Sequence, residues 1–97
     1  MMFNGQRYLT RGVQEQVSIP LQVTLWRMIE NLKIEVDYLQ IFEIEQISDD
    51  QIKITHKQEE PQYEKVTVKS GMIASTHLKI YVIDEYEYST MLLAKEY

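Results

Sequence analysis

Three consecutive stretches decide the fold: LQIFEIEQI at 39–47, QIKITHK at 51–57 and YEKVTVK at 63–69. Apolar and polar side chains alternate in each of them, which is typical of a β-strand with one buried and one exposed face. Turn-forming residues separate the stretches, with Ser48, Asp49 and Asp50 after the first and Pro61 after the second. The sequence therefore predicts a three-stranded antiparallel meander.

The side chains also predict how the first two strands pair. A three-residue turn at 48–50 places Ile44 opposite Ile54 on one face and Glu45 opposite Lys53 on the other. A two-residue turn would shift the pairing by one residue and place Glu45 opposite Ile54. Because such a slip moves a whole apolar set to the wrong face, we expect the first register.

The second hairpin extends the same apolar face. A five-residue loop at 58–62 places His56 opposite Glu64 and Ile54 opposite Val66. Matched pairs of this kind stabilise neighbouring strands. We therefore expect one buried face made of Phe42, Ile44, Ile52, Ile54, Val66 and Val68.

Residues 18–33 are expected to form a helix that covers this face. Ser18 is a suitable N-cap, and Pro20 falls in the first turn, where no amide donor is needed. Apolar side chains recur at helical spacing, with Trp26 beside them. We interpret this stripe as core rather than as a ligand groove. It consists of Leu21, Leu25, Met28, Ile29 and Leu32.

The remaining segments complete a single α+β domain spanning residues 1–97. Residues 77–84 are apolar on both sides, which favours a central strand. Ser89 is expected to cap a short C-terminal helix, and residues 6–10 to form an edge strand before a turn at Gly12. The predicted architecture is a mostly antiparallel sheet (the meander) of four to five strands, covered on one face by one long helix, with a short C-terminal helix. The placement of residues 70–76 is left open.

Composition excludes several classes of protein. The chain has 97 residues, 44% of them hydrophobic, and a net charge of −5. It contains no apolar run of membrane-spanning length and no apolar core of a signal peptide, and the absence of cysteine fits a reducing compartment. We expect a cytoplasmic protein with no membrane association. Direct binding to nucleic acid is not expected, because the basic footprint that it requires is small.

Few residues suggest chemistry. His56 beside Glu64 could act as an acid–base pair, and His77 could act with Ser75 or Thr76 and Asp84. A histidine at the end of a sheet face, satisfied by a carboxylate on the next strand, is the simpler interpretation of the first pair. We predict no catalytic, cofactor-binding or metal-binding residues and no cofactor, since two histidines cannot supply a zinc site and Asp49 and Asp50 suit a turn.

The segment DEYEYST at 84–90 alternates acids with tyrosines, and the chain has seven tyrosines. Tyrosine is enriched in protein interfaces, and acids suit a basic partner. Packing of the tyrosines at a strand end is the alternative. The candidate interaction surface consists of Tyr81, Ile83, Tyr86, Tyr88, Asp84, Glu85 and Glu87.

Four longer stretches carry a resemblance to a known family: RYLTRGVQEQV (7–17), LWRMIENLKIEVDYLQIFEI (25–44), ITHKQEEP (54–61) and YVIDEYEYSTMLLAKEY (81–97). They resemble small uncharacterised bacterial proteins known only as domain of unknown function 960. The resemblance spans nearly the whole chain and implies a small intracellular bacterial protein. It implies no catalytic or binding residue.

The sequence favours a non-catalytic intracellular interaction module that binds a protein partner or a second copy of itself. One alternative is a small acid–base enzyme, similar to a hydrolase, centred on His56 and Glu64 or on His77. Another is an acidic protein that competes with nucleic acid for a basic partner. Its acids would come from residues 35–50, which carry six acids and no base, and from residues 84–88.

Overall fold

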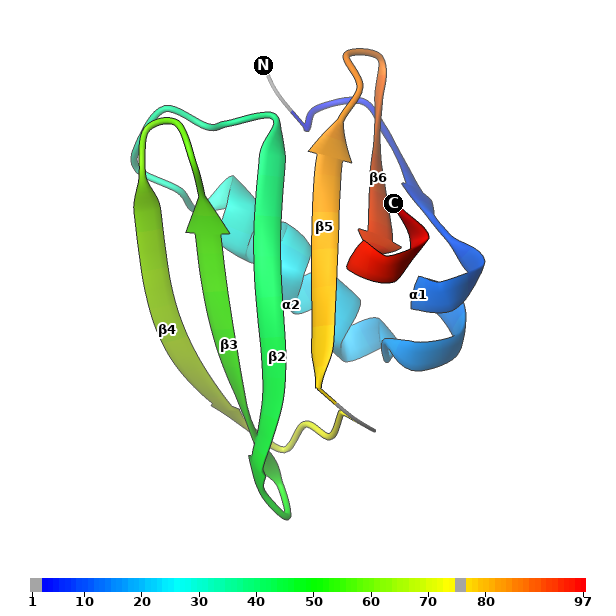
Figure 1. Cartoon of the computed structure of the whole chain (residues 1–97), viewed down its shortest axis with the longest axis vertical. Coiled ribbons are helices and arrows are strands. Elements are labelled where there is room, and N and C mark those ends of the chain that lie inside the picture. Colours follow the sequence, from blue (N-terminus) through cyan, green and yellow to red (C-terminus); the bar gives the residue numbers. More distant parts are fainter. Residues whose placement is uncertain (1–2, 75–76) are drawn as a thin grey trace.

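The computed structural model describes residues 3–74 and 77–97, and these residues form one six-stranded sheet (Figure 1). The spatial order is β1-β6-β5-β2-β3-β4. The strands are β1 (Gln6–Leu9), β2 (Leu39–Ser48), β3 (Gln51–Gln58), β4 (Tyr63–Ser70), β5 (Leu78–Asp84) and β6 (Tyr88–Leu93). The helices are α1 (Arg11–Gln16) and α2 (Ile19–Glu30), and a 3₁₀ turn, η1 (Ala94–Glu96), follows β6.

The prediction of a four- to five-stranded, mostly antiparallel sheet with one long helix is wrong. The sheet has six strands and is mixed, because β1 pairs with β6 in parallel while the other pairs are antiparallel. Both helices are short, with 6 residues in α1 and 12 in α2. A parallel pair needs a long connection and has no turn of its own, so the sequence carried no local signal for it.

The register of the first hairpin is confirmed, although its turn differs from the prediction. Ile44 pairs with Ile54 and Glu45 with Lys53, as expected. Ser48, however, pairs with Gln51, and the pairing is irregular between Gln46 and Ser48. A two-residue turn therefore coexists with the predicted register, because the extra residue forms a β-bulge.

The register of the second hairpin is wrong by one residue. Gln58 pairs with Tyr63, so the loop has four residues rather than five. Gln58 continues the strand because its buried amide donates to the carbonyl oxygens of Glu35 (2.9 Å) and Pro61 (2.9 Å). One consequence is that Val66 and Val68 face away from the core, and their side chains are 53% and 50% exposed. The predicted burial of these two valines is therefore also wrong.

The C-terminal segment is a strand and not a helix. Ser89 lies inside β6, opposite Asp84 of β5, and does not cap a helix. This strand is apolar on both sides, since Met91 and Leu93 point into the core while Leu92 points outward and is 8% exposed. A short apolar run fits either a helix or a strand, and here the pairing with β5 decides it.

The core lies between α2 and one face of the sheet, which we call the inner face. Ser18 caps α2 as predicted, with its hydroxyl accepting from the backbone N–H of Leu21 (3.4 Å). The helix ends at Glu30, with Asn31 as its C-cap, and so is shorter than the predicted 18–33. Figure 1 shows α2 crossing behind the sheet. The buried residues of α2 meet a cluster from the central strands that includes Phe42, Ile44, Ile52, Ile54, Leu78, Ile80, Val82, Met91 and Leu93.

The predicted turn at Gly12 is instead the first turn of α1. The carboxylate of Glu96 accepts from the Gly12 backbone N–H (3.1 Å), the Thr10 hydroxyl (2.6 Å) and the Leu93 backbone N–H (2.8 Å). The hydrogen bond from Thr10 is the main reason that the pKa of Glu96 is lowered. This carboxylate joins the C-terminal turn to the N-terminal helix. None of the helices in the described ranges is both long and apolar enough to cross a membrane.

Candidate functional site

The face of the sheet opposite α2, which we call the outer face, has an apolar centre. Cross-strand pairing aligns Ile41 of β2, Tyr81 of β5 and Leu92 of β6 in one row. A second row pairs Leu39 with Ile83. Strands β2, β3 and β4 lie open toward the viewer in Figure 1, with α2 behind them. Within the described ranges, the apolar row is therefore covered only at its β6 end.

The C-terminal residue provides this partial cover. The ring of Tyr97 packs edge-to-face on Tyr81, with 5.7 Å between the ring centroids. Tyr97 itself is 83% exposed. A similar edge-to-face pair, at 5.4 Å, joins Tyr88 to Tyr8 of the edge strand β1. Aromatic side chains therefore extend the apolar centre across β5, β6 and β1.

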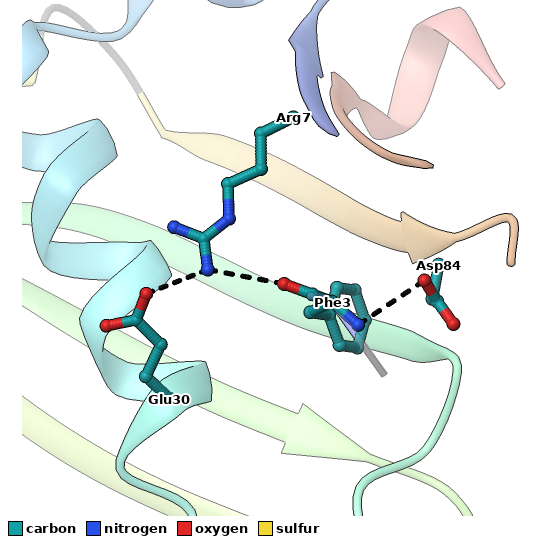
Figure 2. Close-up of polar contacts among 4 residues, drawn as sticks. All are labelled: Phe3, Arg7, Glu30 and Asp84. Atoms are coloured by element: carbon teal, nitrogen blue, oxygen red, sulfur yellow. Dashed lines mark hydrogen bonds and ion pairs between the residues drawn. The ribbon is translucent and has the colours of Figure 1, made fainter. Parts of the chain in front are cut away.

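The structure places the predicted surface residues in three positions. Tyr81, Ile83 and Tyr88 project from the outer face. Tyr86, with the acids Glu85 and Glu87, forms the β5–β6 turn, and its ring is 90% exposed. Asp84 points to the other side, where its carboxylate accepts from the backbone N–H of Phe3 (3.4 Å; Figure 2).

Several residues of this face were missed by the sequence analysis. Leu39, Ile41 and Leu92 belong to it because of the β2–β5 and β5–β6 registers. Val66 and Val68 lie on the same side at the edge of the sheet. The sequence indicated that Tyr81 and Ile83 belong to this face, because residues 77–84 are apolar on both sides. The other residues could be assigned to it only once the order of the strands was known.

Charges on the outer face balance each other. Lys53 forms an ion pair with Glu45 (3.1 Å), and Lys57 with Glu43 (3.5 Å). On the other side of Lys57, Glu64 of β4 lies opposite it. Lys79 of β5 lies opposite Glu43. Three acids and three bases thus balance on β2, β3, β4 and β5, and the Glu85 carboxylate, which accepts from the Thr90 hydroxyl of β6 (3.3 Å), adds one acid at the β6 end.

His56 is a buried, neutral residue. Burial lowers its pKa from 6.5 to about 4. The ring stacks on Phe42 with 4.3 Å between the centroids, and its Nε2 lies 2.6 Å from Oε1 of Gln40. The amide nitrogen of Gln40 donates to Asp37 O (2.9 Å) and to Gln58 Oε1 (2.8 Å), so its oxygen must accept. His56 therefore donates through Nε2–H, which fixes its tautomer.

The predicted pair of His56 with Glu64 does not form. His56 lies opposite Lys65, and Glu64 lies opposite Lys57 on the outer face. The cause is the one-residue difference in the second hairpin. The carboxylate that would orient the imidazole in an acid–base enzyme is replaced by the amide of Gln40, which carries no charge and cannot take up a proton at neutral pH.

The other candidate residues for chemistry are dispersed. His77 is exposed and lines a shallow cavity of about 400 Å³ together with Lys79 and Lys95. The hypothesis that joined it to Ser75 or Thr76 concerns residues outside the described ranges. Asp49 and Asp50 form the β2–β3 turn, and no group of three or more potential metal ligands occurs in residues 3–74 and 77–97.

The two acidic segments lie together only in part. The backbone N–H of Asp84 donates to the carbonyl oxygen of Tyr38 (2.8 Å), so Asp37 lies at the same end of the sheet as residues 84–88. The β2–β3 turn with Asp49 and Asp50 lies at one end of the sheet, and the β5–β6 turn lies at the other (Figure 1). Between them, Glu43 and Glu45 are paired with lysines. A basic partner that contacts residues 84–88 and also uses Asp49 and Asp50 would have to span the length of the sheet.

A cavity lies where the N-terminal segment meets the end of α2. Its volume is about 650 Å³, and its apolar lining includes Ile29 and Val36. At its rim Arg7 donates to Glu30 (2.7 Å) and to the carbonyl of Phe3 (3.4 Å), and its guanidinium lies 4.4 Å from the centre of the Trp26 ring. The charge of Arg7 is thus already compensated, and none of the predicted surface residues lines this cavity.

Comparison with known proteins identifies the family. The family described as staphylococcal protein of unknown function (DUF960) matches residues 6–96, and the chain belongs to it. A solved structure of a protein of unknown function from Enterococcus faecalis is 22% identical, covers 97% of this chain and 92% of its own, and superposes with a TM-score of 0.84. This similarity shows a shared fold. None of the curated proteins compared with the chain matches it.

Proposed function

We propose that this member of the staphylococcal family is a non-catalytic interaction module that binds a second copy of itself through the outer face of its sheet. The observation that carries the proposal is the outer face over β2, β3 and β4, which no second layer covers in the described part of the chain (Figure 1): Val66 and Val68 are exposed there, beside the half-buried Ile41 and Tyr81. Sheets bury such a face by packing on another layer, and a second sheet packs at about 10 Å. In this chain the second layer is supplied by the partner.

Charge favours a second copy over an oppositely charged protein. Copies of a chain with a net charge of −5 repel one another over most of their surface. The part of the outer face formed by β2, β3, β4 and β5 is the exception, because its acids and lysines are equal in number and already neighbours. A two-fold axis through the face would bring a neutral surface against the same neutral surface. A strongly basic partner would gain little there.

The face is large enough for a stable dimer. The molecule measures 37 × 27 × 20 Å, so the side viewed down the shortest axis covers up to roughly 1,000 Å², against about 800 Å² per partner in a standard interface. Apolar side chains near its edges, such as Val66 and Tyr88, would add to a contact that begins at Tyr81. Tyrosine supplies such contact area with few side-chain torsions to fix.

Tyr86 supports a role for the adjoining turn. Its backbone φ is 80°, a value that residues other than glycine adopt only at an energetic cost. Tyr86 is also 90% exposed. A tyrosine that keeps this backbone conformation and does not pack on its own chain is suited to contact a second protein chain. We also place the protein in the cytoplasm, because a chain without cysteine suits a reducing compartment.

The test is the solution mass of the protein as a function of concentration, measured by analytical ultracentrifugation. Tyr81→Glu places a charge at the centre of the proposed contact, and Ile19→Glu places the same charge on an exposed apolar residue of α2, 73% accessible. We expect the native protein and Ile19→Glu to dimerise, and Tyr81→Glu to remain monomeric. The double change of Tyr86 and Tyr88 to alanine should weaken association with the sheet still folded.

Circular dichroism and thermal melting establish that each variant is folded. A native protein that stays monomeric at millimolar concentration would refute self-association. Equal weakening by Tyr81→Glu and Ile19→Glu would show that the outer face is not the contact.

A further inference from the structure

A second surface carries an independent inference. A groove of about 360 Å³ lies on the inner side of the sheet, between the edge strand β4 and the segment that follows α2. Its polar lining comes from both sides: Asn31 and Lys33 from the segment after α2, and Lys65, Thr67 and Lys69 from β4. The groove exists because the pairing of β3 with β4 differs by one residue from the predicted register. The observed pairing turns the side chains of Lys65, Thr67 and Lys69 toward the inner face.

The groove is basic although the chain is acidic. Lys33, Lys65 and Lys69 line it, and no aspartate or glutamate does. Among the described residues these three lysines form no ion pair, whereas Lys53 and Lys57 on the neighbouring strand are both paired. Like charges gathered without counter-charges repel one another, so a bound anion would stabilise this arrangement.

The spacing of the lysines suits one small anion. Lys65 and Lys69 lie on the same side of β4, with Thr67 between them, so their Cα atoms are about 13 Å apart along the strand. Long flexible stems let the two ammonium groups converge above the Thr67 hydroxyl, with Lys33 approaching from the opposite wall. Lysines and a hydroxyl are typical donors to phosphate oxygens.

The remaining lining is apolar and aromatic. Tyr63 stands over the edge of the His56 ring, with 5.4 Å between the centroids, and Met28 lies beside them. His56 is uncharged and donates to Gln40, so it does not add to the positive charge of the groove. A flat apolar group could pack here while its phosphate meets the lysines. The volume lies within the range of small-molecule sites.

We propose that this groove binds a small phosphorylated molecule with a flat ring, of the size of a nucleoside monophosphate. A long polyanion fits less well, because it would continue from the groove onto a surface with a net negative charge. The inference does not depend on self-association, since the groove and the outer face lie on opposite sides of the sheet.

The test is a titration of the protein with the four common ribonucleoside monophosphates, followed by amide chemical shifts in NMR spectra. Parallel titrations use the uncharged nucleosides, inorganic phosphate and a single-stranded RNA 12-mer. We expect saturable shifts centred on Lys65, Thr67 and Lys69 with at least one monophosphate, and binding at least about tenfold weaker with its nucleoside or with inorganic phosphate.

Two double variants with the same charge change provide the control. Lys65→Gln with Lys69→Gln should weaken binding at least about tenfold, and Lys53→Gln with Lys57→Gln, on the outer face of the adjacent strand, less than about twofold. Mapping on the native protein does not depend on the folding of either variant. No saturable shift with any monophosphate, equal weakening by both variants, or tighter binding of the RNA would each overturn the proposal.

Discussion

Acidification should destabilise the protein through His56, well above the pH at which carboxylates become protonated. The imidazole is 1% exposed and stacks on Phe42, and its polar partner Gln40 is held in place by Asp37 and Gln58. A proton on Nδ1 would create a charge in this buried site. Gln40 cannot compensate for it, because its oxygen already accepts from Nε2–H.

The sign and size of the effect follow from the pKa. Burial lowers it from 6.5 to about 4, so between these values the unfolded chain binds a proton that the folded chain does not. The stability contributed by the neutral imidazole is complete above pH 6.5 and is lost as the pH falls toward 4. At about 1.36 kcal/mol per pKa unit, the loss is roughly 2 kcal/mol at pH 5 and roughly 3 kcal/mol below pH 4.

The assay is urea denaturation at intervals between pH 5 and 8, where Glu96 contributes little because the pKa of its carboxyl is lowered from 4.5. His56→Gln keeps an amide donor for Gln40 and cannot titrate. His56→Gln should lower the free energy of unfolding by about 1–3 kcal/mol at pH 8, through lost packing. It should also remove most of the dependence of that free energy on pH below 6.5. His77→Gln removes the exposed histidine and is the matched control.

An NMR titration observes the same group directly. The reasoning is refuted if the His56 ring titrates near 6.5, if its proton resides on Nδ1, or if His56→Gln keeps the native slope. Loss of a biological activity in His56→Gln, at unchanged melting temperature and unchanged solution mass, would instead revive an acid–base role.

Three further predictions concern stability, each measured by denaturant unfolding. Ile54→Ala, in the core, should cost about 2–5 kcal/mol, and Lys53→Ala, on the outer face, well under 1 kcal/mol, so equal costs would contradict the assignment of the two faces. Ser89→Ala should raise stability by up to about 1 kcal/mol, because the buried Ser89 hydroxyl has no hydrogen-bond partner among the described residues; a loss would reveal a missed partner. Tyr86→Gly should stabilise by up to about 1 kcal/mol by relieving the positive φ, whereas Tyr86→Ala should not, and identical effects would show that the backbone there is unstrained.

The sequence predicted those parts of the fold in which local pattern and burial agree. The alternation of apolar and polar side chains along 39–57 specified the pairing of Ile44 with Ile54, because a slip of one residue would have placed Glu45 in the core. The same pattern tolerated a different turn, since a bulge absorbed the extra residue. The N-cap at Ser18 was predictable for a similar reason, because its hydrogen bond involves neighbouring residues only.

The sequence misled where burial is polar or pairing is distant. Gln58 resembles a loop residue, yet it is buried and ends a strand because four hydrogen bonds satisfy its amide nitrogen and its amide oxygen. The parallel pairing of β1 with β6 joins segments about 80 residues apart and leaves no local signal. For the candidate surface, Tyr81 and Ile83 were predictable from their own strand, while Ile41 required the register of its neighbour.

The register of β4 connects the two proposed surfaces. In the register expected from the sequence, Val66 and Val68 would face α2, and Lys65 and Lys69 would lie on the outer face beside Lys53 and Lys57. The outer face would then carry an excess of positive charge and would not suit a second copy of itself. With the four-residue loop, the valines join the apolar outer face. Lys65 and Lys69, which form no ion pair among the residues that the structure describes, line the groove on the other side. An edge strand permits this arrangement, because neither of its faces must be fully buried. The buried amide of Gln58, which ends β3 one residue later than the pattern suggests, stabilises the register that balances the charges of β2 to β5 on one surface and gathers lysines on the other.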